Sequence, residues 1–81
     1  MTRIDAITAI LEELVKAEEK HPCWPTDTIH VVAVVCEESG EALQAALNEH
    51  YHDGTVDDIK RELCHTGATV IRALMNLESH S

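Results

Sequence analysis

The sequence predicts an all-α fold in a single domain, residues 1–81, with three helices at about 3–20, 27–50 and 56–78. Hydrophobic residues make up 44% of the chain but aromatic residues only 2%, so Ala, Val, Leu and Ile supply the apolar side chains, as in packed helices. These apolar residues recur at steps of three and four, which is the period of an amphipathic helix. Prolines and a glycine separate the three periodic segments.

The first predicted helix, residues 3–20, is amphipathic. Its apolar side chains repeat with helical spacing at Ile4, Ile7, Ile10, Leu11, Leu14 and Val15. Pro22 and Pro25 end this helix, because each proline removes a backbone donor and restricts the residue before it. Either Thr26 or Asp27 can cap the helix that follows.

The second predicted helix, residues 27–50, is apolar around most of its circumference. Its single glycine, Gly40, costs about 1 kcal/mol relative to alanine, which a long helix absorbs. Apolar residues lie on one side at Ile29, Val32, Cys36, Leu43 and Leu47, and on another at Val31, Val35 and Ala42. Because two other helices cannot surround it, we expect a homo-oligomer, either a homotetramer built as a dimer of dimers or a dimer.

The third predicted helix, residues 56–78, follows a turn at Gly54 and a capping-box-like start from Thr55 to Asp58. One stripe of this helix is apolar, with Val56, Ile59, Leu63, Val70, Leu74 and Leu77. Beside it runs a polar stripe with Asp58, Glu62, His65, Thr69 and Asn76. The polar stripe makes this helix a candidate for a functional site.

The composition argues against several classes of protein. The 15 Asp and Glu residues outnumber the 6 Lys and Arg residues, and this net charge of -9 predicts that nucleic acid is not a partner. The longest apolar run, Val31 to Cys36, is far shorter than the roughly 20 residues that span a bilayer, so we expect no membrane partner.

The 3 cysteines form no close-spaced pair, which predicts neither a disulfide framework nor a CxxC zinc site. The first residues lack a signal-peptide pattern, and we expect a cytoplasmic protein.

The carboxylates of the second predicted helix carry the main functional signal. Glu38 points into an arc of apolar residues, and Glu41 follows one turn later. Two ionised carboxylates on an apolar wall repel each other and lose hydration, and a divalent cation offsets both costs. Glu62 and His65 repeat the three-residue spacing on the third helix. Two facing helices would therefore present four side chains of the kinds that bind metals.

Three of the candidate residues have alternative interpretations. Glu37 falls on the polar edge of its helix, where it is a solvated side chain, a residue beside the metal ligands or an additional ligand. His65 is either part of the site or a helix-border histidine bonded to a neighbour. Trp24 either packs at the start of the second helix or stacks on a base.

The segment Glu37-Glu38-Ser39-Gly40-Glu41, followed later by Glu62-Leu63-Cys64-His65, resembles the EExxE and ExxD signature of the MazG-like, all-α nucleoside triphosphate pyrophosphohydrolases. The segment Trp24-Pro25-Thr26-Asp27 is similar to the aromatic and polar residues that precede the first motif helix in that family. His65 stands where the family has Asp, so three family carboxylates remain, at Glu38, Glu41 and Glu62.

The resemblance implies Mg²⁺-dependent cleavage between the α and β phosphates of a nucleoside triphosphate, giving a monophosphate and pyrophosphate, as in nucleotide-pool house-cleaning. It also implies four-helix-bundle active sites in a homo-oligomer. The implied catalytic residues are Glu38, Glu41 and Glu62, which with His65 would hold Mg²⁺ or, alternatively, Mn²⁺. The implied substrate-binding residues are Trp24, Arg72 and Asn76. The basic side chains that could bind the phosphates are Lys16, Lys20, Lys60, Arg61 and Arg72.

Two other functions compete with this interpretation. A di-iron carboxylate bundle also uses Glu from two helices and Glu-x-x-His from two others, and a dimer of this chain could supply that set. The second rival is a non-catalytic helical interaction module that kept the fold and lost the chemistry. The replacement of the family's Asp by His65 keeps this second rival open.

Overall fold

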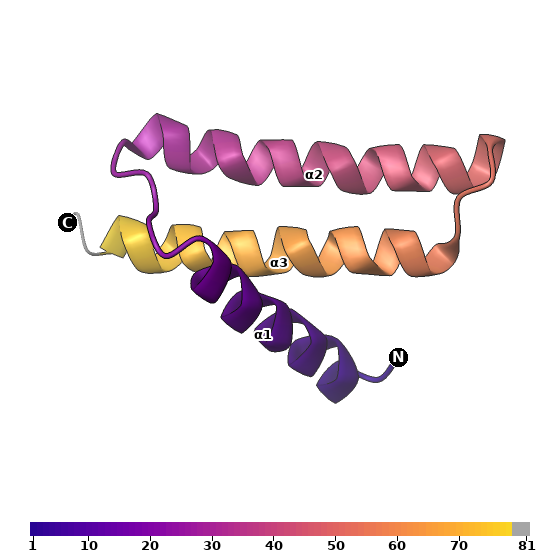
Figure 1. Cartoon of the computed structure of the whole chain (residues 1–81), viewed down its shortest axis with the longest axis horizontal. Coiled ribbons are helices and arrows are strands. Elements are labelled where there is room, and N and C mark those ends of the chain that lie inside the picture. Colours follow the sequence, from indigo (N-terminus) through magenta and orange to yellow (C-terminus); the bar gives the residue numbers. More distant parts are fainter. Residues whose placement is uncertain (79–81) are drawn as a thin grey trace.

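A computed structural model describes residues 1–78 and contains three α-helices, α1 (Arg3–Lys20), α2 (Thr28–Tyr51) and α3 (Val56–Glu78) (Figure 1). No strand occurs in this part of the chain. The all-α prediction and the three predicted helices are therefore confirmed, with each end within one residue of its predicted position.

Short polar side chains fix where the helices begin. Thr2 and Asp5 form a capping box at α1, in which each side chain accepts a hydrogen bond from the other's backbone amide, both at 3.1 Å. Thr55 and Asp58 repeat this reciprocal pair at α3, again at 3.1 Å. At α2 the cap is Asp27, whose carboxylate accepts a backbone hydrogen bond at 3.0 Å. The caps thus satisfy donors that the first helical turns leave free.

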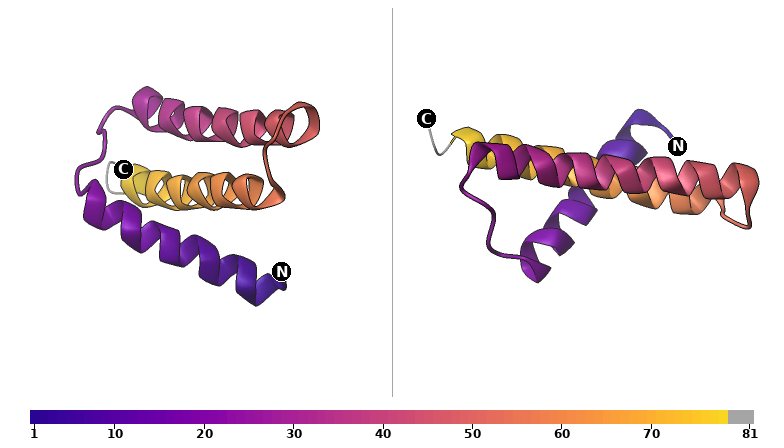
Figure 2. Two further views of the ribbon diagram at one scale, coloured as in Figure 1. Left: turned by 45° about the vertical axis from the view of Figure 1, so that its right-hand side comes forward. Right: turned by 90° about the horizontal axis from the view of Figure 1, so that it is seen from above.

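Helix α3 is the central element, because it packs against both α1 and α2. Helices α2 and α3 run antiparallel and side by side, whereas α1 crosses α3 obliquely (Figures 1 and 2). The crossing is close at Gly67, where an added Cβ would lie 2.9 Å from the Cδ1 atom of Ile10. Side chains from all three helices can therefore meet along α3.

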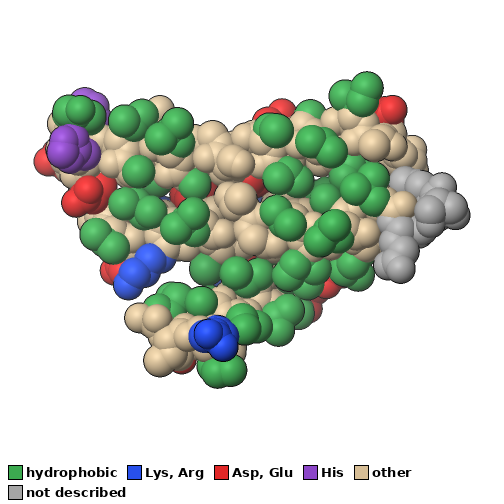
Figure 3. Space-filling view, turned by 180° about the vertical axis from the view of Figure 1, so that it is seen from behind, with side chains coloured by type: hydrophobic (Ala, Val, Ile, Leu, Met, Phe, Trp, Pro, Cys, Tyr) green, Lys and Arg blue, Asp and Glu red, His purple; other side chains and the backbone are tan. Residues whose placement is uncertain are grey.

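The buried apolar side chains are few and mostly small: Leu14, Val31, Ala42, Ala45, Ala68 and Ala73. Large apolar side chains remain exposed on every helix, including Leu11 on α1, Ile29 on α2 and Leu74 on α3. Figure 3 shows hydrophobic side chains spread over all three helices on one face of the molecule. Because burial stabilises by about 0.8 kcal/mol per methylene, a core made largely of alanine gives a single chain little hydrophobic stabilisation.

Arg72 on α3 forms hydrogen bonds with the end of α1. Its side chain is buried, and its guanidinium donates hydrogen bonds to the backbone oxygens of His21 at 2.6 Å and Ala17 at 3.3 Å. These acceptors belong to the last turn and C-cap of α1, and the Ala17 oxygen also accepts the backbone N–H of His21 at 2.8 Å. The segment that joins α1 to α2 is thereby held against α3.

Within residues 1–78, no helix has both the length and the apolar character needed to cross a bilayer.

Candidate metal centre

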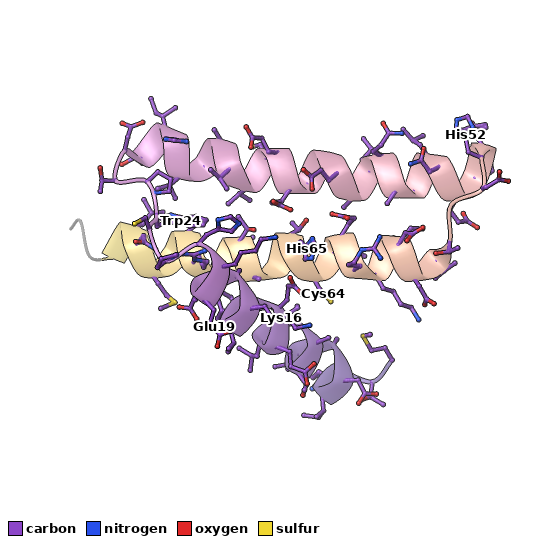
Figure 4. All side chains as sticks on the ribbon, viewed as in Figure 1. Lys16, Glu19, Trp24, His52, Cys64 and His65 are labelled. Atoms are coloured by element: carbon purple, nitrogen blue, oxygen red, sulfur yellow. The ribbon has the colours of Figure 1, made fainter. Side chains whose placement is uncertain are left out.

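Three side chains from two helices form a cluster of metal-ligand type: Glu38 on α2, and Glu62 and His65 on α3. One atom from each lies within 4.8 Å of the other two. Glu62 and His65 share one face of α3 because they are one turn apart. Figure 4 shows His65 where side chains of α2 and α3 converge between the two helices. The cluster thus depends on the antiparallel pairing of these helices.

Both glutamates of the cluster have a buried carboxylate oxygen without a hydrogen-bond partner, Glu38 Oε2 and Glu62 Oε2. An unsatisfied buried acceptor costs about 1–3 kcal/mol, and more when it is charged. Burial raises the pKa of Glu38 above its ordinary value of 4.5, and the negative charges of Glu41 and Glu62 raise it further, while His65 opposes this shift. A bound cation would remove both penalties, so these oxygens fit a metal site.

The ring of His65 lies between two carboxylates. Its Nδ1 atom is 3.5 Å from Glu62 Oε2, and its Nε2 atom is 3.0 Å from Glu13 Oε1 on α1. Glu13 is not among the residues that sequence reasoning assigned to the site. The sequence signal for Glu13 is its position next to Leu14, at the border of the apolar stripe of α1.

Glu41 lies next to this cluster without belonging to it. Its side chain is exposed, and its negative charge contributes to the raised pKa of Glu38. Glu41 and Glu62 line a cavity of about 570 Å³ between α2 and α3, which extends to His52 at the end of α2. Glu37 is exposed and lies outside the cluster.

A second cavity, of about 300 Å³, adjoins the cluster on the α1 side. Glu38 and His65 line one part of it, and Lys16 and Lys20 of α1 line another. These two lysines thus share a cavity with two residues of the cluster, whereas Arg72 shares a different cavity with Glu38 alone among them. Arg61 lines the larger cavity but is paired with Asp58 at 2.8 Å.

The predicted substrate-binding residues lie near the junction of α1, α2 and α3. The Arg72 guanidinium stacks over the Trp24 ring, and both residues line a cavity of about 250 Å³ together with Glu38. The indole Nε1 of Trp24 is buried without a hydrogen-bond partner. Asn76 donates a hydrogen bond of 2.7 Å to the backbone oxygen of Arg72, one turn earlier on α3. Trp24 and Arg72 are thus close to the cluster, and Asn76 follows them along α3.

Comparisons of the chain with protein-family models, with curated proteins and with solved structures gave no match.

The donor set of the cluster is two carboxylates and one imidazole. Carboxylate oxygens suit Mg²⁺ and Mn²⁺, and imidazole suits Mn²⁺ and later transition metals better than Mg²⁺. Donor atoms around one cation, with bonds of about 2.0 to 2.2 Å, lie about 3 to 4 Å apart, whereas the ligand atoms of this cluster lie at most 4.8 Å apart. Three protein donors leave coordination positions for water or a phosphate oxygen.

Proposed function

We propose that the protein is a nucleoside triphosphate pyrophosphohydrolase of the MazG-like type, which uses Mg²⁺ or Mn²⁺ to cleave between the α and β phosphates. The observation that carries the proposal is the pair of unpartnered, buried oxygens, Glu38 Oε2 and Glu62 Oε2, beside His65. Such a cluster binds a cation that in turn binds phosphate oxygens. The sequence pattern around these residues supports the same reaction.

In this proposal Glu38, Glu62 and His65 would hold the cation, which would neutralise phosphate charge and lower the pKa of a water molecule. The water oxygen forms a bond to one of the two phosphorus atoms, the bond from that phosphorus to the oxygen bridging the α and β phosphates breaks, and the nucleoside monophosphate and pyrophosphate separate. Glu41 is exposed beside Glu38, so it can hold a second cation or accept the proton of the water. Glu37, exposed on the same helix, has no direct part in these steps.

Lys16 and Lys20 are the basic side chains best placed to bind the pyrophosphate leaving group. They line the same cavity as Glu38 and His65, so an anion bound to a cation in the cluster could extend toward them. Trp24, which shares a different cavity with Glu38, could stack on the base. Arg72 and Asn76 would support Trp24 from α3.

We also propose that the active protein is a homotetramer, built as a dimer of dimers, or alternatively a dimer, with four-helix-bundle active sites. The exposed apolar residues on all three helices support this proposal, because surfaces of this kind bury themselves in interfaces. Sedimentation at micromolar concentration should therefore give a species of at least two chains. A monomer under these conditions would contradict it.

A cytoplasmic location completes the proposal. The three cysteines, Cys23, Cys36 and Cys64, are all free thiols, which suits a reducing compartment.

The reaction is tested with a panel of canonical and modified nucleoside triphosphates, assayed with Mg²⁺ and with Mn²⁺. Release of pyrophosphate together with the nucleoside monophosphate is the expected result. Release of orthophosphate would show that a different bond is cleaved. No product from any triphosphate would favour the non-catalytic helical interaction module.

A di-iron carboxylate bundle is the second candidate, because the structure brings the Glu62-x-x-His65 pair together with Glu38. Metal analysis of the purified protein separates the two functions. Tightly bound iron and an oxidase activity would support the di-iron site, whereas weakly bound Mg²⁺ or Mn²⁺ would support hydrolysis.

A further inference from the structure

We propose that Glu13 is a positioning residue that fixes His65 with its Nδ1 atom directed to the metal, and that this makes the site prefer Mn²⁺ over Mg²⁺. The inference rests on the proposed metal site, but not on the identity of the substrate. It assigns α1 a part in a cluster whose other members lie on α2 and α3.

The first step concerns the Nε2 atom of His65, which lies 3.0 Å from Glu13 Oε1. A nitrogen lone pair that faced a carboxylate at this distance would be repelled, whereas an N–H group would be attracted. Because this contact is shorter than the 3.5 Å between Nδ1 and Glu62 Oε2, it favours the ring form that carries hydrogen on Nε2.

The second step concerns the opposite ring nitrogen. A neutral imidazole has one N–H group, so a ring protonated on Nε2 has its lone pair on Nδ1. This Nδ1 atom lies 3.5 Å from Glu62 Oε2, the oxygen that is buried without a hydrogen-bond partner. The separation is that expected of two donor atoms bound to one cation. The contact with Glu13 thus leaves the lone pair of His65 Nδ1 beside Glu62 Oε2, where both atoms can bind one cation.

The third step is the placement of Glu13 itself. Leu14, the next residue, is buried, and the close approach of Ile10 to Gly67 fixes how α1 lies on α3. The Nε2 atom of His65 therefore contacts a helix that packs against α3. A carboxylate that holds the far nitrogen of a metal-binding histidine orients the ring and strengthens it as a ligand.

The consequence is a choice of metal. Mg²⁺ is a hard cation that keeps its water and prefers oxygen ligands, so an oriented imidazole adds little to its binding. Mn²⁺ accepts imidazole more readily, and gains affinity from each contact that holds the ring in place. Removal of Glu13 should therefore weaken Mn²⁺ binding more than Mg²⁺ binding.

The test compares Glu13→Ala with the matched control Glu12→Ala, which removes an exposed glutamate from the neighbouring position of the same helix. Binding of MnCl₂ and of MgCl₂ is measured by calorimetry on the full chain without nucleotide. We expect Glu13→Ala to weaken Mn²⁺ binding about ten- to a hundredfold, with a much smaller change for Mg²⁺. Glu12→Ala should change neither, and Glu13→Gln, whose amide oxygen can still accept from Nε2, should recover part of the loss.

A second measurement determines which ring nitrogen of His65 carries hydrogen. The ¹⁵N chemical shifts of His65 in the metal-free protein should show hydrogen on Nε2 in the wild type, and a mixture of ring forms in Glu13→Ala. Circular dichroism checks that the variants remain helical, and Glu13→Gln serves if Glu13→Ala does not fold.

The inference is overturned by equal losses of Mn²⁺ and Mg²⁺ affinity in Glu13→Ala, because Glu13 would then act only as a negative charge. It is also overturned by hydrogen on Nδ1, or by a wild-type protein that binds no Mn²⁺. If Glu13→Ala shows the selective loss while no triphosphate is hydrolysed, the metal site stands and the proposed reaction fails.

Discussion

The guanidinium of Arg72 lies over the indole ring of Trp24, with its central carbon 4.6 Å from the ring centroid. The same group donates hydrogen bonds to the backbone oxygens of His21 and Ala17. One side chain of α3 thus holds the last turn of α1 and the segment before α2. Its planar fork of donors serves both contacts at once, which a lysine cannot do.

Arg72→Ala should lower the free energy of unfolding by about 2–4 kcal/mol, because it removes two charge-assisted hydrogen bonds and a cation–π contact. Arg72→Lys should lose a smaller part. Urea unfolding followed by circular dichroism measures both. Arg61→Ala is the control, since the exposed ion pair of Arg61 with Asp58 contributes little. A loss no larger than that of Arg61→Ala would contradict this role for Arg72.

Glu38→Gln and Glu62→Gln should each abolish metal-dependent turnover, because each removes a carboxylate from the proposed ligand set. The helical fold should persist in both variants, since the loss of one charge relieves repulsion in the cluster. Glu37→Gln is the matched control on the exposed side of α2 and should retain most activity. Pyrophosphate release at fixed Mg²⁺ measures all three, and equal losses would place Glu37 in the site.

The pKa of Glu38, raised above 4.5 mainly by burial and then by the charge of Glu41, predicts a pH dependence of stability in the metal-free protein. The folded chain holds this proton more tightly than the unfolded chain does, so stability falls as pH rises from 4.5 through the folded pKa. Glu38→Gln lacks this loss. Its stability advantage over the wild type should therefore appear above pH 4.5 and level off at higher pH.

Urea unfolding in the presence of a chelator, repeated across this pH range, measures the difference. Asp58 provides a comparison of opposite sign, because hydrogen bonds from the backbone and side chain of Thr55 lower its pKa below 3.8. Its contribution is present above 3.8 and is lost as pH falls through the folded pKa. Parallel curves for the wild type and Glu38→Gln would show that Glu38 ionises freely in the fold.

His65→Asp introduces the carboxylate that the MazG-like pattern has at this position. If His65 is a ligand, the variant should use Mg²⁺ at lower concentration than the wild type, because an oxygen donor replaces imidazole. The readout is a Mg²⁺ titration of turnover, with a parallel Mn²⁺ titration. Unchanged titrations and unchanged turnover would remove His65 from the site.

Local sequence signals were sufficient to predict the helices. Helical periodicity and the prolines define their extents, and the reciprocal pair Thr55 and Asp58 was visible as a capping pattern. The choice between Thr26 and Asp27 was not visible, because both side chains can accept a backbone hydrogen bond. In the structure, Asp27 is the N-cap residue of α2.

The site could be predicted only in part. The spacing of Glu38, Glu62 and His65 on two helices is a local property, and the structure brings these three residues together. Glu13 and Arg72 owe their positions to how α1 crosses α3, which depends on contacts such as Gly67 against Ile10. No periodicity in one helix specifies the angle and register at which it crosses another.

The shortage of large buried side chains links the stability of this protein to the proposed association of its copies. If copies associate through the exposed apolar side chains, unfolding also separates the chains, and the melting temperature rises with total protein concentration. Dilution would then act like a destabilising substitution. A change such as Leu43→Ser, on an exposed position of α2, could abolish turnover at nanomolar protein and leave it intact at micromolar protein, although it touches no metal ligand.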